Sequence, residues 1–486
     1  MSGDTESAFG SEPVAATQPG DAPVAASAAE PNTEGPANGL RETDGDPAGG
    51  PAGALVRTET GSSADPSRYP RRSLGARLFF GTGRTIIALA SIAVLVATWY
   101  AWTNVRALND GIARTNVIDP AAVAPQAAQG GSVAPLDSAV NILVVGIDSR
   151  TDPEGNPLPA NELAMLDAGP DDGEQDTDTM ILVHIPAGGQ RAVAISFPRD
   201  SYVQLAGGFG MNRLNSAYAF AHNAEKTELE QQGQTDAAAI ERQADDAGRK
   251  NLIDTIQNLT GNSIQINEYA EINLVGFYNL SQAVGGVQVC LKAPTYDDET
   301  HAHFPAGVQT LQGVQALQFV RERHGLPNGD LDRIVRQQVF LGSLANKILS
   351  ANTLANPSKL ESLIQAVQGS VVLSSGWDIT TFAQQMAGLS SGNISFATIP
   401  TGNNFTTSGG ADVTQISPSK VAQFVTGMVG AADNGTPFTD TDTPTETVSP
   451  SSSNSPDGSA NAGSSSTSSP PTSTNVITAN GIPCVD

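Results

Sequence analysis

Cationic residues are scarce in this chain. Of its 486 residues, 25 are Lys or Arg and 50 are Asp or Glu, which gives a formal net charge of -25 at pH 7. This strongly negative overall charge argues against nucleic-acid binding. Two cysteines are too few to build a four-thiolate zinc site. No G-x-S-x-G motif is present to indicate a serine hydrolase of the α/β type.

Long hydrophobic runs are rare as well, and the one at 85–102, TIIALASIAVLVATWYAW, predicts a membrane anchor. A helix of this length spans about 27 Å, close to the hydrocarbon core of a bilayer. A buried core helix would show a polar face, and a cleaved signal peptide would lie nearer the N-terminus. Close to the run, the N-terminal side carries Arg68, Arg71, Arg72, Arg77 and Arg84, whereas the C-terminal side carries only Arg106 and Arg114. The positive-inside rule therefore places the N-terminus in the cytoplasm and the C-terminal part outside the cell.

Low-complexity sequence flanks the central part of the chain. Residues 1–67 and 434–486 are rich in Ala, Pro, Gly, Ser and Thr, and they cannot bury enough apolar surface to offset the entropy of ordering. We predict a disordered cytoplasmic tail at 1–67, a basic juxtamembrane segment at 68–84, a transmembrane helix at 85–102, an extracellular linker at 103–137, one large globular domain at 138–433, and a low-complexity tail at 434–486 that ends in a Cys-containing segment.

The two cysteines, Cys290 and Cys484, both follow the predicted anchor. The outside of the cell is potentially oxidising, so we predict a disulfide that ties the end of the C-terminal tail to the globular domain. Such a bridge closes a long loop, and loop entropy favours stabilisation. The alternative is a pair of free thiols.

Buried strands alternate with helices in the central region. Apolar runs at 142–147, 178–185 and 191–198 are typical of strands covered on both faces. Helices are expected at 213–232, 248–261, 310–323 and 331–349, a strand followed by a helix at 267–286, and a short strand at 287–291. This alternation predicts an α/β sandwich with a mixed central sheet.

Acidic residues stand at the ends of two predicted strands. Asp148 follows the first strand, and Asp176 and Asp178 precede the core of the second. Ligands of open α/β sheets bind near strand ends, and carboxylates gathered there repel one another unless a cation lies between them. Mg²⁺, or Mn²⁺ as a second choice, prefers oxygen ligands and would neutralise these carboxylates. Taken singly, each aspartate is explained equally well as a turn or capping residue.

Arginines gather in one stretch of this acidic chain. Arg321, Arg323, Arg333 and Arg336 fall within sixteen positions, and no arginine follows Arg336. Arg333, Arg336 and Gln337 would form one stripe on a helix, and Arg321 and Arg323 would share a face of an extended chain. Guanidinium groups match phosphate oxygens in pairs. The stretch therefore predicts a site for a pyrophosphate or phosphodiester, with a solvated helix face as the alternative.

The tripeptide Pro198-Arg199-Asp200 ends the third predicted strand, where side chains can point into a cleft. By itself it is explained equally well by a surface salt bridge. Together with the other arginines and a carboxylate-bound cation, Arg199 would complete a clamp of the kind used in phosphoryl transfer.

Six ordered segments resemble the LytR–CpsA–Psr family. They are NILVVGIDSR, DTDTMILVHI, AISFPRDSYV, RLNSAYAF, EINLVGFYNLSQAVGGVQV and the pair LQGVQALQFVRERH and DLDRIVRQQ, within residues 138–350. Members of this family are membrane-anchored enzymes of Gram-positive cell envelopes. They transfer wall teichoic acid, capsule or arabinogalactan from a polyprenyl-pyrophosphate carrier to peptidoglycan. The resemblance implies an α/β/α sandwich that holds the lipid tail in an apolar groove.

The resemblance also implies roles for single residues. The metal ligands would be Asp148 and Asp178. The pyrophosphate-binding residues would be Arg150, Arg199, Arg213, Arg321, Arg323, Arg333, Arg336 and Gln337. The catalytic residues would be Asp148, Asp178, Arg199, Asp200, Arg321 and Arg323. The chain departs from the family at Asp176-Thr177, where Arg-Ser is common, and at Arg213, where lysine is usual.

The implied function is that of an Mg²⁺-dependent phosphotransferase that moves an arabinogalactan, teichoic-acid-like or capsular glycopolymer to peptidoglycan through a phosphodiester link. Its partners would be the polyprenyl-pyrophosphate-linked glycopolymer, the peptidoglycan acceptor and membrane lipid, with no nucleic acid. It would be a single-pass protein of the cell membrane with an extracellular catalytic domain. The terminal IPCVD resembles actinobacterial members and favours arabinogalactan. Two alternatives stay open: a pyrophosphatase of polyprenyl-pyrophosphate lipids, and a non-catalytic protein that binds envelope lipid or polymer.

Overall fold

The computed structural model describes residues 111–118, 136–152, 156–168, 175–298, 300–349, 357–368, 371–386, 389, 393–436, 477–478 and 482–486, all of which belong to one compact unit. The predicted tail, juxtamembrane segment and transmembrane helix lie outside these residues, as do most of the linker and of the C-terminal tail. Among the helices in the described ranges, none is long and apolar enough to cross a membrane.

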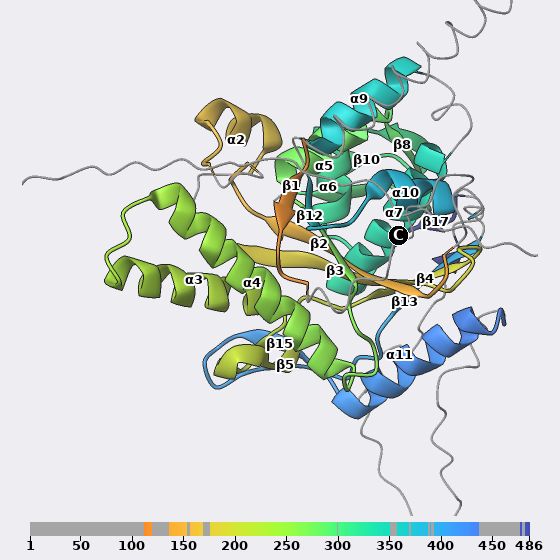
Figure 1. Cartoon of the computed structure of the whole chain (residues 1–486). Helices are drawn as coiled ribbons and strands as arrows, with labels where there is room; N and C mark the ends of the chain where they lie inside the picture. Colours follow the sequence, from red (N-terminus) through yellow and green to blue (C-terminus); the bar gives the residue numbers. More distant parts are fainter. Residues whose placement is uncertain are drawn as a thin grey trace, which may run out of the picture. The chain divides into compact units, whose positions relative to one another are not determined.

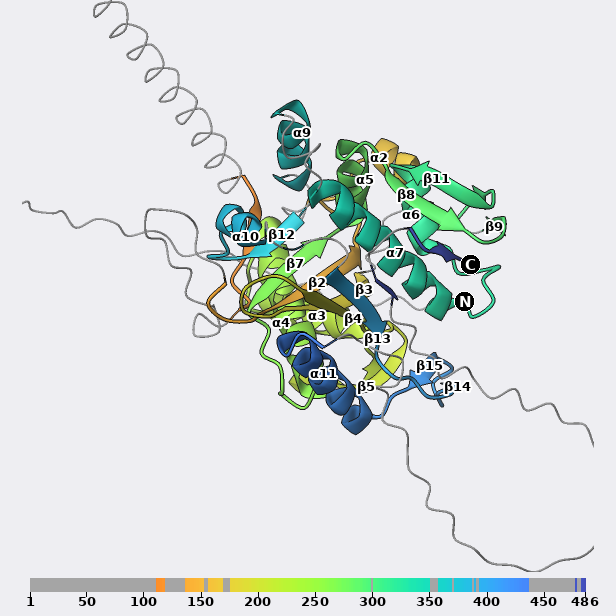
Figure 2. The same cartoon turned by 90° about the vertical axis from the view of Figure 1, so that its right-hand side faces the viewer.

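A mixed sheet of eight strands lies at the centre of the described residues, in the order β1-β12-β7-β2-β3-β4-β13-β16 (Figures 1 and 2). Its strand β2 is parallel to β7 and antiparallel to β3. The strands are β1 (Ala113–Thr115), β2 (Val140–Asp148), β3 (Asp176–Ile185), β4 (Ala192–Ser196), β7 (Glu268–Ile272), β12 (Val371–Ser374), β13 (Ile394–Thr398) and β16 (Ile477–Thr478). The three predicted apolar runs form β2, β3 and β4, so the expected mixed α/β fold is confirmed.

Helices cover both faces of this sheet. On one face, Leu143 and Val145 of β2 pack in a cluster with Leu252 of α4 (Ala237–Leu259), Ala217 of α3 (Ser216–Gln231) and Phe424 of α11 (Pro418–Asp433). The other face carries α5 (Leu274–Ala283), α6 (Val314–Arg321), α7 (Asp330–Leu349), α9 (Pro357–Gln368) and α10 (Ile379–Gln385). Alternate residues of β2 point to opposite faces, so each face of the strand has its own helical cover.

Two helices differ in extent from the prediction. Helix α4 begins at Ala237, where the Asp236 side chain accepts a hydrogen bond from the Ala239 amide at 3.2 Å. Its first turns were missed because they bury few large apolar residues. Helix α6 begins only at Val314, because Gly313 has a φ of 57° and interrupts the chain after strand β11 (Gly307–Leu311). The left-handed conformation at Gly313 favours glycine and separates the strand from the helix.

Smaller sheets surround the central one. Strands β14 (Asn404–Thr406), β15 (Asp412–Gln415), β5 (Ser201–Leu205) and β6 (Gly210–Arg213) form a four-stranded sheet in that order. The remaining elements are β9 (Thr295–Asp297) with β10 (Ala302–Phe304), the three-stranded sheet β11-β8-β17 with β8 (Val287–Leu291) and β17 (Cys484–Val485), the short helix α2 (Ala160–Leu166) and the 3₁₀ turn η1 (Ala206–Gly208).

The predicted disulfide is present. Cys290 of β8 is bonded to Cys484 of β17, and the two Cα atoms are 4.3 Å apart. The bridge holds the last residues of the chain beside α7, where Arg336 Nε donates a hydrogen bond to the carbonyl of Asp486 at 2.6 Å. The end of the chain is therefore part of the folded domain.

Candidate functional site

An apolar pocket that is partly open to solvent lies between the sheet and helices α5, α6 and α7, and its empty space, including the part open to solvent, is about 730 Å³. Its apolar walls are Val144, Ile272, Leu274, Phe277, Leu317, Val320, Phe340 and Leu341. Its polar lining consists of Asp148, Asp178, Thr179, Asn273, Arg321 and Gln337. A cavity built this way suits a ligand with a long apolar part and a charged head.

The backbone of β2 and β3 explains how both carboxylates reach this cavity. On β2, the alternation that buries Val145 in the core on one face directs Val144 and Asp148 to the other. On β3, the register shifts: Gly146 pairs with Thr179, but Ile147 pairs with Thr177, which leaves Asp178 as the extra residue of a β-bulge. Bulges commonly re-aim a side chain next to an active site.

Four arginines surround the two aspartates. Arg199 Nη1 donates to Asp178 Oδ1 at 2.8 Å, and Arg333 Nη1 lies 3.7 Å from Asp178 Oδ2. Arg321 Nη2 lies 3.7 Å from Asp148 Oδ2. The fourth, Arg150, lies 3.8 Å from Asp148 Oδ1. Each of the two aspartates at the cavity therefore lies beside two arginines.

Arg150 and Arg199 are each held in place by a further contact. Arg150 donates from Nε and Nη2 to the carbonyl of Ala168 at 3.1 and 3.0 Å, which fixes its plane. Arg199 Nε lies 3.7 Å from a carboxylate oxygen of Asp200. Asp200 in turn lies 3.9 Å from Arg213 Nε. The predicted residues Arg199, Asp200 and Arg213 thus form one line of contacts that starts at Asp178.

The ionisation of this cluster follows from its neighbours. Burial opposes the charge on Asp178, but the guanidinium groups of Arg333 and Arg199 outweigh it and lower the pKa of the carboxyl. Burial opposes the charge on Arg199, but the combined attraction of Asp178, Asp200 and Asp330 outweighs it and raises the pKa of the guanidinium. Burial lowers the pKa of Arg333, although arginine stays protonated in proteins. Asp178 is therefore an anion beside two cations.

Sequence reasoning missed one carboxylate of the cluster. Asp330, in the first turn of α7, lies 2.5 Å from Arg333 Nη2 and 3.5 Å from Arg199 Nε. Burial raises its pKa, and Arg333 only partly offsets this. The signal that could have found it is its position three residues before Arg333 in the sequence.

The predicted stripe on α7 does not share one environment. Gln337 lines the cavity, and its side-chain amide donates to the Val320 carbonyl at 3.1 Å. Arg336 is fully buried and forms an ion pair with Glu322, which is also fully buried. Arg336 and Gln337 are consecutive residues of α7, so their side chains point about 100° apart around the helix and meet different neighbours.

Arg321 and Arg323 also differ. Arg321 is the last residue of α6 and lines the cavity. Arg323 follows the end of the helix and is exposed, and its backbone amide donates to Asp297 Oδ2 at 3.3 Å. Asp176 accepts a hydrogen bond from Asn215 Nδ2 at 2.9 Å.

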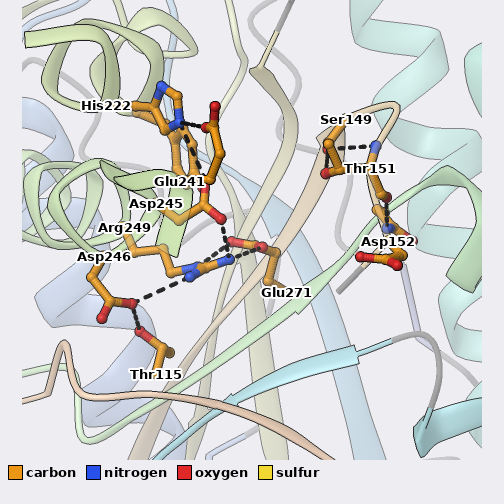
Figure 3. Close-up of polar contacts among 12 residues, drawn as sticks. Thr115, Ser149, Thr151, Asp152, His222, Glu241, Asp245, Asp246, Arg249 and Glu271 are labelled. Atoms are coloured by element: carbon orange, nitrogen blue, oxygen red, sulfur yellow. Dashed lines mark hydrogen bonds and ion pairs between the residues drawn. The ribbon is translucent and has the colours of Figure 1, made fainter. Parts of the chain in front are cut away.

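A second polar cluster lies on the opposite face of the sheet, against α4 (Figure 3). Arg249 donates from Nε and Nη2 to the two carboxylate oxygens of Glu271 at 3.0 and 2.8 Å, and Tyr218 donates to Asp245 at 2.9 Å. Glu271 directly precedes Ile272, which lines the apolar cavity. These contacts therefore attach the end of β7 to α4 on the face of the sheet opposite the cavity.

The residues at the cavity fit a divalent cation shared with a phosphate ligand. Mg²⁺ is usually held by one or two carboxylates together with substrate phosphates and water, and Asp148 and Asp178 supply two carboxylates in one cavity. A Mg²⁺ site made of protein ligands alone would need more than these two carboxylates. Among the described residues, no group of three or more His, Cys, Asp or Glu could hold a metal ion.

Fold and site together define a mixed α/β domain with an arginine–aspartate cluster at an apolar cavity. The sequence gives the family of this domain: residues 111–428 match the model of the LytR_cpsA_psr family. The chain belongs to this family, so the resemblance noted above is confirmed.

Several curated relatives are similar to this chain. Cell wall biosynthesis protein LcpA of Corynebacterium glutamicum is 43% identical over 351 residues, which are 72% of this chain and 66% of LcpA. The probable cell wall biosynthesis protein LcpB of the same organism is 33% identical, over 51% of this chain and 52% of LcpB. The polyisoprenyl-teichoic acid–peptidoglycan teichoic acid transferase TagU of Enterococcus faecalis is 30% identical, over 39% of this chain and 54% of TagU. The chain thus spans 52–66% of the lengths of these relatives.

Solved structures with similar chains include TagV of B. subtilis, with a TM-score of 0.45 and 20% identity over 62% of this chain and 99% of TagV. A structure described as TagT bound to LI-WTA has a TM-score of 0.43 and 17% identity, over 65% of this chain and 98% of TagT. The family assignment rests on the sequence match.

Proposed function

We propose that this protein transfers a cell-wall glycopolymer from a polyprenyl-pyrophosphate carrier to peptidoglycan and leaves a phosphodiester link. The observation that carries the proposal is the position of the cluster formed by Asp148, Asp178, Arg199, Arg321 and Arg333 at an apolar pocket. An apolar chain and a diphosphate occur together in a lipid carrier. The name of TagU agrees with this substrate class, and the name of LcpA agrees with a role in the cell wall.

Charge balance supports a diphosphate bound together with a cation. In the cluster, Asp148 and Asp178 each lie beside two arginines. An anion alone would compete with these carboxylates for the arginines, and the displaced carboxylates would repel it. A divalent cation on the carboxylates removes this conflict, and Asp148 and Asp178 are the residues that would hold Mg²⁺ or Mn²⁺. When bound, the ion would neutralise charge on the phosphates.

In the proposed reaction, a sugar hydroxyl of peptidoglycan attacks the phosphorus that carries the glycopolymer. A bond forms between the hydroxyl oxygen and this phosphorus, the bond from this phosphorus to the bridging oxygen breaks, and polyprenyl phosphate leaves. Arg199, Arg321 and Arg333 hold the phosphate oxygens and stabilise charge on the leaving group. They cannot accept the hydroxyl proton, because arginine stays protonated.

The proton of the attacking hydroxyl goes to a carboxylate of the cluster. Asp178 is a weak acceptor, because neighbouring arginines lower its pKa. Asp330 is a stronger one, because burial raises its pKa and the efficiency of a general base rises with its pKa as long as it is ionised at the working pH. Asp200, which lies 3.7 Å from Arg199, is the remaining candidate.

We further propose that the chain is a single-pass protein of the cell membrane. The support is the uncharged run at 85–102 with arginines on its N-terminal side. The catalytic domain would then lie outside the cell, beside the lipid-linked donor. Arabinogalactan or a related polymer is the glycopolymer we favour, because the terminal IPCVD resembles actinobacterial members of the family.

The test incubates the full-length chain in detergent with a polyprenyl-pyrophosphoryl saccharide, peptidoglycan and Mg²⁺. Saccharide joined to peptidoglycan through phosphate supports the transferase, and chelation should stop the reaction until Mg²⁺ or Mn²⁺ is restored. Release of free phosphorylated saccharide alone would identify a pyrophosphatase. Donor binding without turnover would identify a binding protein.

Arg321→Ala tests the proposed clamp. Arg321 lines the cavity and is only 29% exposed, so its loss should reduce turnover about 100- to 1000-fold, as loss of one charge-stabilising donor does. The matched control is Arg242→Ala, which removes an exposed arginine of α4. Equal turnover in the two variants, with unchanged thermal stability, would remove Arg321 from the site.

A further inference from the structure

The four-stranded sheet β14-β15-β5-β6 has an outward side that the donor reaction does not use. Tyr202 of β5 is paired with Arg213 of β6 and with Gln415 of β15, and directly paired residues point to the same side of a sheet. Gln204 and Met211 form the next pair. We call this side the hairpin face, and it consists of Tyr202, Gln204, Met211, Arg213, Phe405 and Gln415.

Most side chains of the hairpin face are exposed, although Val413, which is paired with Phe405 on this side, is buried. Val203 and Leu205 of β5 point inward and pack with α4 and α11 in the core. On the hairpin face, Met211 is 47% and Phe405 41% exposed, and Gln204 and Gln415 are also exposed. Figure 2 shows β14, β15 and β5 together at the edge of the domain away from α9. Exposed apolar groups gathered on one surface commonly mark a binding site.

Two aromatic rings on this surface are held in a fixed geometry. The Tyr202 and Phe405 rings meet edge to face, with centroids 5.5 Å apart and planes at 89°. Such a pair presents a rigid apolar surface with little loss of conformational entropy on binding. The amides of Gln204 and Gln415 lie on the same side of the sheet and can both donate and accept hydrogen bonds.

The hairpin face is continuous with the arginine–aspartate cluster. Asp178 contacts Arg199 at 2.8 Å, Arg199 lies 3.7 Å from Asp200, and Asp200 lies 3.9 Å from Arg213. Arg213 is paired in register with Tyr202. A molecule lying on the hairpin face would therefore reach the phosphate-binding cluster at the Arg213 end.

The chemistry of the hairpin face suits a neutral, hydroxyl- and amide-rich ligand. Its one cation, Arg213, lies beside the carboxylate of Asp200, so the surface has little net charge to attract a polyanion. Rings of Tyr and Phe can cover the apolar face of a sugar, and glutamine amides can bind its hydroxyl and N-acetyl groups. A donor whose apolar chain fills the cavity leaves this surface to the second substrate.

We propose that the hairpin face binds the N-acetylated glycan strand of the acceptor and positions its hydroxyl at the arginine–aspartate cluster. This inference rests on the proposed function, because it assigns a site to the second substrate of that reaction. Tyr202, Phe405 and Gln415 act as positioning residues, since they hold the glycan and do not touch the reacting phosphorus.

The test measures glycan binding without any donor. A soluble tetramer of β-1,4-linked N-acetylglucosamine is titrated into the full-length chain, and the Michaelis constant for peptidoglycan is measured separately. Phe405→Ala should raise both the dissociation constant and the Michaelis constant about tenfold, the equivalent of one aromatic contact. Gln415→Ala should raise both in the same direction, and Phe405→Tyr should keep binding near that of the wild type. The maximal rate at saturating acceptor should not change.

The matched control is Tyr296→Ala. Tyr296 is 62% exposed on β9 and forms an edge contact with His303 at 6.1 Å, so it offers a similar aromatic pair away from the hairpin face. Unchanged tetramer affinity in both Phe405→Ala and Gln415→Ala would overturn the inference, and so would an equal loss in Tyr296→Ala. If the wild type consumed no donor, the proposed function would fail, whereas tetramer binding would still report on the hairpin face by itself.

Discussion

Replacement of Arg336 by Met separates a structural arginine from a phosphate-binding one. Arg336 and Glu322 form an ion pair in which both side chains are fully buried. The guanidinium also donates to the Asp486 carbonyl at 2.6 Å and lies 5.0 Å from the centroid of the Phe319 ring. Arg336→Met keeps most of the side-chain volume but leaves the Glu322 carboxylate buried without its cation, with Thr295 Oγ1 as a remaining hydrogen-bond donor.

The expected cost follows from this burial. Removing one partner of a buried ion pair lowers the free energy of unfolding by about 3–5 kcal/mol. For a domain of this size, each kcal/mol lowers the melting temperature by roughly 2–4 °C, so we expect a decrease of roughly 10 °C. Circular dichroism during heating and a urea titration would measure both quantities. Turnover of the variant, assayed well below its melting temperature, should stay within about threefold of that of the wild type. This corresponds to a difference of less than about 1 kcal/mol in activation free energy.

A double variant serves as the control. Arg336→Met combined with Glu322→Gln removes the stranded charge and keeps an acceptor for Thr295, so it should recover more than half of the lost stability. The reasoning would be refuted if Arg336→Met left the melting temperature unchanged and abolished turnover. That result would place Arg336 among the phosphate-binding residues, as the family resemblance implies.

Two further predictions concern stability. Burial raises the pKa of Glu268 from 4.5 to about 7, so the protonated carboxyl stabilises the fold below pH 4.5 and this contribution is lost as the pH rises through 7. Between pH 4.5 and 8, the free energy of unfolding of the wild type should therefore decrease by up to about 3 kcal/mol relative to that of Glu268→Gln. If the urea midpoints of the two proteins changed equally with pH over this range, the prediction would be contradicted. Cys290→Ser with Cys484→Ser should lower the free energy of unfolding by about 2–5 kcal/mol in urea titrations, and a thiol that titrates in the unreduced wild type would argue against the bridge.

Much of the central fold was predictable from local patterns. The apolar runs that became β2, β3 and β4 are long and uninterrupted, as expected for strands covered on both faces. The segment DLDRIVRQQVFLGSLANKIL became α7 over Asp330–Leu349, because its apolar residues recur with helical spacing. Boundaries were less predictable. Gly313 ended a strand and preceded a helix within a segment expected to be helical throughout.

The candidate site was only partly predictable, because it is built from distant parts of the chain. Asp148 and Arg321 could each be selected by type and position, but only the packing of α6 against the sheet brings them to 3.7 Å. The bulge that directs Asp178 into the cavity depends on the register with β2, which a single strand does not encode.

By itself, the sequence determined where β2, β3, β4 and α7 lie, that the chain belongs to its family, and that arginines are concentrated in an acidic protein. These features depend on the order and spacing of neighbouring residues. Only the tertiary structure decided that Arg333 faces Asp178 whereas Arg336 is buried with Glu322, and that Asp330 joins the cluster. Electrostatic and hydrogen-bond energies fall steeply with distance and with exposure to solvent. A charged side chain therefore binds a ligand or a neighbouring residue according to which groups the long-range packing brings within a few ångströms of it.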